Sequence, residues 1–131
     1  MEKFAPLSPE LERLAKIVVD AAFKVHKTLG PGLLESVYEV CLAHELRLRG
    51  LVVETQVDVP IVYEGVHLDA GLRLDMLVEK QLLVELKSVE DMHPVFEAQL
   101  LTYLTLTGQR LGLLINFNVP LIKDGIRRII L

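Results

Sequence analysis

Three charged side chains that could do chemistry lie inside two short apolar segments. These segments occupy residues 72–88 and are separated by a polar break at residues 79–81. Because each segment is too short for a helix, the pattern predicts a β-hairpin. The charged residues are Asp75, Glu85 and Lys87. A charge within an apolar strand costs free energy unless a partner pairs with it or coordinates it, so such a partner is expected here.

The register of this hairpin decides what the three groups could do together. Glu85 and Lys87 are two residues apart and should project from one face of their strand. A three-residue turn would pair Val78 with Leu82 and place Asp75 opposite Glu85, with their Cβ atoms about 5 Å apart. Carboxylates that close repel unless a proton or a cation lies between them, and a hard divalent cation prefers oxygen ligands. A two-residue turn would instead place the two acids on opposite faces.

Three helices are expected to position this hairpin, at residues 9–28, 33–49 and 94–107, because apolar residues recur there at helical spacing between capping and breaking residues. The first helix should bury Leu11, Leu14, Ala15, Val18, Ala21, Ala22, Val25 and Leu29. The second should bury Leu34, Val37, Cys41, Leu42 and Leu46. The third should bury Val95, Ala98, Leu101 and Leu104.

Strands are predicted between and after the helices. Residues 53–59 alternate between apolar and polar side chains, and Pro60 should interrupt that strand. Residues 111–117 are almost wholly apolar and suit a strand buried on both faces, while residues 126–131 suit an edge strand. A crossover through the third helix should make strands 82–88 and 111–117 parallel. The expected fold is therefore α/β, with a mixed β-sheet flanked by helices.

Composition predicts a single folded domain over residues 1–131. The sequence is 51% hydrophobic and 24% charged, which is typical of a globular chain and not of a disordered one. The mean hydropathy of +0.39 is high for a small protein, yet no apolar run is long enough to span a membrane. The surplus apolar surface predicts a homo-oligomer, of which a dimer is the simplest.

Charge and cysteine content narrow the expected partners and compartment. The single cysteine, Cys41, cannot form an internal disulfide, and the N-terminus has no signal-peptide pattern, so a cytoplasmic protein is expected. The formal net charge of −4 argues against a broad electrostatic grip on nucleic acid. A local basic groove around an acidic metal site remains compatible with it.

An ordered set of polar residues runs through the chain: Glu35, Asp75, Glu85-x-Lys87 and Gln99-x-x-x-Tyr103. This set resembles the PD-(D/E)XK nuclease superfamily. More narrowly, Gly32-Leu-Leu-Glu35-Ser-Val-Tyr38 resembles the signature of the GxxExxY proteins, which are grouped with that superfamily. The resemblance extends from about Val25 to Arg128. The proline of the superfamily's name is absent, and Leu74 stands before Asp75.

The resemblance implies a restriction-endonuclease-like core and metal-dependent hydrolysis of phosphodiester bonds in nucleic acid, with DNA as the expected partner. Asp75 and Glu85, with the carbonyl group of Leu86, would hold Mg²⁺ or Mn²⁺, and Glu35 would be a further acidic ligand. Lys87 would hold the attacking water or neutralise charge on the phosphate. The alternatives are an Asp75–Lys87 ion pair on an exposed strand, and a Glu35 that only favours the helix dipole.

Five further residues could support such a site. Tyr38 shares a helix face with Glu35 and would either orient that carboxylate or pack. Gln99 and Tyr103 would support the site or contact a substrate phosphate, or form a pair on the helix surface. Arg73 would be a charge partner of Asp75 or a phosphate contact. His26 could reach the metal site, although a hydrogen-bonded structural histidine is the favoured interpretation.

Two interpretations of the whole chain remain open at this point. The intact acidic set with Lys87 favours a nuclease, whereas the acidic net charge and small size favour a non-catalytic interaction domain that keeps the fold and binds a metal at most. The late basic residues are either a phosphate track or solvated turn charges; they are Arg110, Lys123, Arg127 and Arg128. Glu39 is interpreted as a solvated neighbour of the site.

Overall fold

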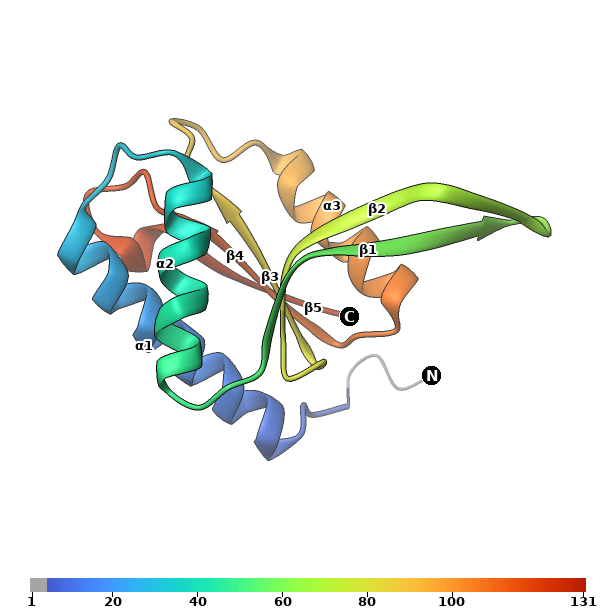
Figure 1. The fold of residues 1–131 in the computed structure, drawn as a ribbon, viewed down its shortest axis with the longest axis horizontal. Helices are drawn as coiled ribbons and strands as arrows, with labels where there is room; N and C mark the ends of the chain where they lie inside the picture. Colours follow the sequence, from blue (N-terminus) through green and yellow to red (C-terminus); the bar gives the residue numbers. More distant parts are fainter. Residues whose placement is uncertain (1–4) are drawn as a thin grey trace.

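The computed structural model describes residues 5–131, apart from the side chain of Ala70, and shows a five-stranded sheet with three long helices (Figure 1). The strands lie in the order β1-β2-β3-β4-β5, with β3 and β4 parallel and every other neighbouring pair antiparallel. The predicted mixed α/β fold and its parallel crossover pair are therefore confirmed. In chain order the elements are α1 (Pro9–Leu29), α2 (Glu35–Leu48), β1 (Val53–Tyr63), β2 (Val66–Val78), β3 (Leu82–Lys87), α3 (Pro94–Thr107), β4 (Leu111–Asn116), the 3-10 helix η1 (Ile122–Gly125) and β5 (Ile126–Ile130).

Two apolar clusters hold the helices to opposite sides of the sheet. The larger cluster joins α1 and α2 to residues such as Val84 and Leu113, and the smaller joins α3 to Leu83 and Leu114. Because side chains alternate along a strand, consecutive residues of β3 and β4 serve the two clusters in turn. Among the helices of residues 5–131, none combines the length and the apolar character needed to cross a membrane.

Short local signals fix the ends of α1 and α3. The hydroxyl of Ser8 accepts a hydrogen bond from the Leu11 amide at 3.1 Å, and Pro9 occupies the first turn of α1. At α3, the Nδ1 atom of His93 accepts a bond from the Val95 amide at 3.1 Å. Gly108 ends α3 in the left-handed region with φ of 70°, a conformation that glycine adopts without a Cβ penalty.

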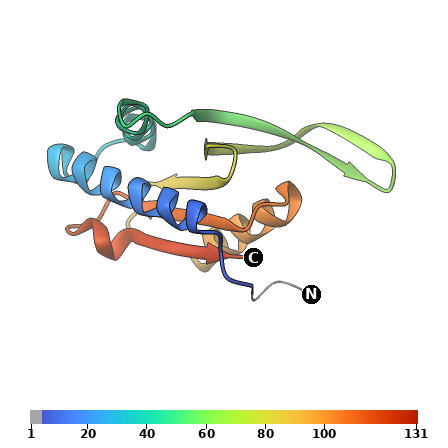
Figure 2. The ribbon, with the colours of Figure 1, turned by 90° about the horizontal axis from the view of Figure 1, so that it is seen from below.

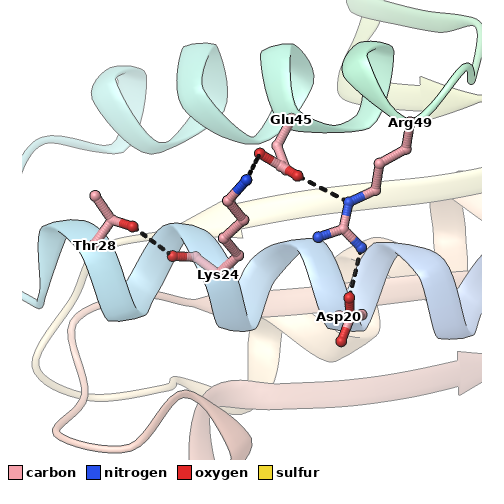
Figure 3. A network of polar contacts seen from close by, with 5 residues as sticks. All are labelled: Asp20, Lys24, Thr28, Glu45 and Arg49. Carbon is pink, nitrogen blue, oxygen red and sulfur yellow. Dashed lines mark hydrogen bonds and ion pairs between the residues drawn. The ribbon is translucent and has the colours of Figure 1, made fainter.

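A polar network ties α1 to α2 across their exposed side (Figure 3). Arg49, which directly follows α2, bonds to Asp20 on α1 at 2.6 Å and to Glu45 at 2.9 Å, and Lys24 bonds to Glu45 at 3.1 Å. Hydrogen bonds from Arg49 and Lys24 lower the pKa of Glu45. This network holds the two helices in register over their common face of the sheet.

The strands β1 and β2 form a long ribbon that extends beyond the rest of the molecule (Figures 1 and 2). The expected interruption at Pro60 was wrong, because β1 continues through it with a register shift between Val59 and Ile61. A proline is tolerated there because β1 is an edge strand. Gly71 makes the close approach possible, since a Cβ atom there would lie 2.2 Å from the Val59 carbonyl oxygen.

The predicted inward faces were correct for α1 and partly wrong for the other helices. Every α1 residue predicted to be buried is buried except Leu29, which is partly buried. On α2, Leu34 and Val37 are exposed, and the buried residues are Tyr38, Leu42, Ala43 and Leu46. On α3, three of the four expected residues are exposed, namely Val95, Ala98 and Leu101. The apolar residues of α3 lie on all sides of the helix, so their spacing could not identify the face that packs through Leu100 and Leu104.

Candidate functional site

The hairpin of β2 and β3 has the three-residue turn. Val78 pairs with Leu82 and Met76 pairs with Val84, which places Asp75 opposite Glu85 one step further along. The Gln81 amide donates to the Val78 carbonyl oxygen at 3.0 Å and closes the turn. The two-residue alternative, which would separate the acids onto opposite faces, is therefore excluded.

Asp75 lies where β2 parts from β3, a place that we call the fork. The ladder between these strands ends at Met76 and Val84, and β2 continues along β1 alone. Leu74 packs in the α3 cluster, whereas Met76 packs in the α1–α2 cluster. Residues two apart normally share a face of a strand, so the alternation breaks at Asp75. Opposite it on β1, Gln56 has a φ of 53°, an uncommon conformation for a residue other than glycine.

The two acids of the fork bond to the backbone of the facing strand. Asp75 Oδ2 accepts a hydrogen bond from the Leu86 amide at 2.9 Å, and Glu85 Oε2 accepts one from the Asp75 amide at 2.9 Å. The side chains thereby complete backbone pairing at the point where the strand ladder stops. Each carboxylate keeps an oxygen that takes no part in these bonds.

Glu85 is the most perturbed acid of the site. Its residue is only 8% exposed, and burial, reinforced by the negative charge of Asp75, raises its pKa to about 8. Lys87 opposes this rise. A buried carboxyl group with a raised pKa and a second carboxylate beside it is the arrangement in which a proton or a cation relieves repulsion.

A small pocket of about 200 Å³ joins the fork to α2, and we call it the acidic pocket; its lining residues are Glu35, Ser36, Glu39, Gln56, Asp75 and Leu86. Glu35 is the first residue of α2. Although Glu35 as a whole residue is exposed, partial burial raises the pKa of its carboxyl group, the charge of Lys87 opposes the rise and that of Asp75 adds to it. The pocket thus brings Glu35 of α2 next to Asp75 of β2, and the Asp75 amide in turn bonds to Glu85 of β3.

Glu39 belongs to this pocket, and its interpretation as a solvated neighbour missed that. Burial raises the pKa of Glu39, and the charge of Asp75 contributes to the rise, while a hydrogen bond from Gln56 Nε2 at 2.6 Å opposes it. The sequence could have placed Glu39 in the pocket, because it lies four residues after Glu35 and the two acids therefore share a helix face. Gln56 carried no such signal, because its place depends on the strand register.

Lys87 leaves the sheet beside these acids and points to α3. Its Nζ atom lies 4.4 Å from the centre of the Phe96 ring. Among residues 5–131, Lys87 takes part in no ion pair, so the alternative of an Asp75–Lys87 pair is not observed. The charge of the ammonium group lowers the pKa values of both Glu35 and Glu85.

The donor set of the fork fits a hard divalent cation, but it is not arranged as a finished metal site. Carboxylate and carbonyl oxygens are the ligands that Mg²⁺ and similar ions prefer. Within the described part of the chain, no three His, Cys, Asp or Glu side chains converge in a way that could hold one ion.

Tyr38 and His26 have structural partners away from the carboxylates. The Tyr38 hydroxyl donates to the Gly30 carbonyl oxygen at 2.5 Å and accepts from the Leu33 amide at 3.1 Å, and its ring stacks on Phe117 at 4.5 Å. Tyr38 therefore stabilises the turn before α2 and does not orient the Glu35 carboxylate directly. His26 Nε2 donates to the Val119 carbonyl oxygen at 2.8 Å, which agrees with the favoured structural interpretation.

The other three supporting candidates differ in their relation to the fork. Tyr103 is half-buried in the α3 cluster, and burial, together with the charges of Glu85 and Asp75, raises its pKa. Gln99 is exposed one turn earlier on α3. Arg73 bonds to Asp58 across the ribbon at 3.0 Å, and Asp75 is not its partner.

Three of the four late basic residues bond within the chain, so neither the phosphate-track nor the solvated-charge interpretation describes them. Arg127 bonds to Glu97 at 2.5 Å and Arg128 bonds to Glu12 at 3.0 Å. Arg110 donates to the backbone carbonyl oxygens of Leu131 and Ala5. These arginines therefore stabilise the fold around β5.

The family model of the PD-(D/E)XK nuclease superfamily matches residues 12–129, a span that includes every candidate residue of the fork and the acidic pocket. No curated protein and no solved structure gives a significant match. The mixed sheet flanked by helices agrees with the restriction-endonuclease-like fold of that superfamily, as the sequence predicted.

Proposed function

Because the chain belongs to the PD-(D/E)XK nuclease superfamily, we propose that it hydrolyses phosphodiester bonds in nucleic acid, with DNA as substrate and Mg²⁺ or Mn²⁺ as cofactor. Nucleases of this superfamily generally use divalent metals. The observation that carries the proposal is that Asp75 lies beside Glu85 at the fork, where the Asp75 amide donates to Glu85 Oε2, with Lys87 two residues further along β3. A narrower assignment to the GxxExxY proteins rests on residues 32–38.

Each residue of the site has a proposed task. Asp75, Glu85 and the carbonyl group of Leu86 hold the cation, and Glu35 adds a further carboxylate from α2. When bound, such a cation polarises the phosphodiester and lowers the pKa of a bound water. Lys87 holds the attacking water or neutralises the negative charge that grows on the phosphate. Gln99 and Tyr103 contact the substrate or support the acids from α3.

A second candidate function is a non-catalytic interaction domain with the same fold. It is favoured by one observation: Asp75 and Glu85 already bond to backbone amides at 2.9 Å and hold the fork together without a metal. In that case the acids would be structural, and their substitution would alter stability with no activity to lose. The two candidates are separable by one assay.

The test is cleavage of duplex DNA, single-stranded DNA and RNA with Mg²⁺ or Mn²⁺. We expect Asp75→Asn and Lys87→Met to lower the rate by about 100-fold or more, because each removes charge stabilisation in the transition state. Asn retains an acceptor for the Leu86 amide, so the fork should remain folded. Lys16→Met, on the exposed side of α1, is the matched control and should retain the full rate. A folded wild-type protein that cuts none of these substrates would replace this proposal with the interaction domain.

We also propose that the protein is one domain and acts in the cytoplasm as a homo-oligomer. The single Cys41 supports a reducing compartment. Large apolar side chains on the surface support self-association, among them Leu34 at 74% exposure and Leu48 at 67%.

A further inference from the structure

Phe96 of α3 contacts Lys87 beside the fork, a contact that the sequence did not predict. Its ring lies under the ammonium group of Lys87, with 4.4 Å between Nζ and the ring centre. Contacts of this length are attractive, because the face of an aromatic ring carries negative charge density. Phe96 belongs to the smaller apolar cluster, so the position of the ring is set by packing.

The kind of partner matters for what Lys87 can do. A carboxylate partner would neutralise the ammonium group and occupy its N–H donors. A ring attracts the same charge but accepts none of its hydrogen bonds in the ordinary geometry. None of the ion pairs formed by residues 5–131 includes Lys87, so its charge and donors remain available beside the acids of the fork.

The start of α3 determines where the ring stands. His93 caps the helix and Pro94 occupies its first turn, which fixes the direction of the first residues. The His93 ring meets the Phe96 ring edge-on, with centres 6.3 Å apart and planes at 62°. Leu100, one turn further on, is fully buried and anchors α3 to the sheet.

We propose that Phe96 is a positioning residue that holds the Lys87 ammonium group at the fork while leaving its donors available to a substrate phosphate. This inference rests on the proposed nuclease function for its catalytic consequence. The placement itself does not depend on activity. Two experiments therefore test the two parts separately.

The placement is tested by NMR of protein carrying ¹³C-labelled lysine. The Lys87 ε-CH₂ signal, identified by its loss in Lys87→Arg, should be shifted upfield by the ring current of Phe96. The shift should persist in Phe96→Tyr, which keeps a ring, and should disappear in Phe96→Leu. A Lys87 signal that coincides with those of exposed lysines in the wild-type protein would overturn the inference.

The catalytic consequence is tested by steady-state cleavage kinetics. Phe96→Leu should lower kcat about tenfold with a smaller change in KM, a factor that corresponds to about 1.4 kcal/mol, and Phe96→Tyr should restore most of the rate. Leu100→Val, which loosens the same helix without removing a ring, is the matched control and should lower kcat much less. Equal losses in Phe96→Leu and Leu100→Val, or no rescue by Tyr, would refute a positioning role. If the wild-type protein cuts nothing, the nuclease proposal fails and the NMR signal alone decides the placement.

Discussion

Among the acids of the site, Glu85 has the most strongly shifted pKa. It is buried beside Asp75, and its pKa is raised from 4.5 to about 8, first by burial and then by the neighbouring charge. Glu35 and Glu39 have raised pKa values for the same first reason. Without a cation, the folded protein therefore binds protons at neutral pH that the unfolded chain releases.

This difference predicts the direction of the pH dependence of stability. Between pH 4.5 and about 8, the folded state binds more protons than the unfolded state, so the free energy of unfolding should fall as pH rises and level off above that window. Glu85→Gln keeps a neutral, hydrogen-bonding side chain and should flatten the dependence, leaving the variant more stable than the wild type at the upper end. Urea unfolding in a chelator measures this. Glu64→Gln, at the exposed turn of the ribbon, is the control, and an unchanged slope in Glu85→Gln would contradict the prediction.

The same experiment with cation tests the metal site. Mg²⁺ or Mn²⁺ should raise the free energy of unfolding by about 1.4 kcal/mol at a free concentration ten times the Kd. Because protons compete for the carboxylates, the gain should be larger at about pH 8 than at about pH 6. In Glu85→Gln the gain should shrink. Equal free energies of unfolding with and without cation in the wild type would argue against binding at the fork.

The sequence allowed part of this site to be predicted, and the reason is spacing. Asp75, Glu85 and Lys87 could be placed together because a strand has a period of two and a three-residue turn fixes the register. Phe96 and Gln56 could not be placed, because their positions depend on which face of α3 packs and on the pairing of β1. Glu39 was within reach of sequence reasoning, since it is four residues from Glu35.

At the scale of elements, the position of α2 depends on the turn that precedes it. The Tyr38 hydroxyl bridges the Gly30 carbonyl oxygen and the Leu33 amide, while its ring is buried against Phe117. This bridge fixes the chain two residues before Glu35, the acid that α2 contributes to the acidic pocket. Tyr38 therefore acts on the site through backbone geometry.

Tyr38→Phe should isolate the effect of that hydroxyl. The ring stacking is retained, but two partly buried hydrogen bonds to the backbone are lost, so the free energy of unfolding should fall by about 1–3 kcal/mol. Tyr63→Phe, at a position that is 69% exposed, should change stability little. Urea unfolding of both variants gives the comparison, and equal stability of the two would show that the bridge is unimportant.

Elements were predictable where one strong pattern dominated. The face of α1 was predicted almost completely because its apolar residues keep helical spacing while the other face is polar. The face of α3 was not, since Val95, Leu100 and Leu101 are all apolar and only packing on β4 selects among them. The unbroken ribbon also escaped prediction, because the bulge that admits Pro60 needs Gly71 on the other strand.

At the scale of the whole molecule, the charge distribution gives little basis for broad electrostatic binding of nucleic acid. The chain has a net charge of −4, and within residues 5–131 each arginine side chain bonds to a carboxylate or a backbone carbonyl group of the same chain. Broad electrostatic binding needs many basic groups directed at phosphates. Recognition through a metal and Lys87 would not require them.

Apolar side chains on the surface support self-association. The salt dependence should show whether the contact between copies is apolar or made of ion pairs. Val40 and Leu48 of α2 are each 67% exposed and Tyr63 of the ribbon is 69% exposed, surfaces that are costly to leave in water. Light scattering should therefore give a mass of at least twice the 14.7 kDa of one chain. Because each copy is acidic, added salt should screen repulsion and strengthen an apolar contact, whereas it would weaken one made of ion pairs. A mass of one chain at high protein and salt concentration would refute the expected homo-oligomer.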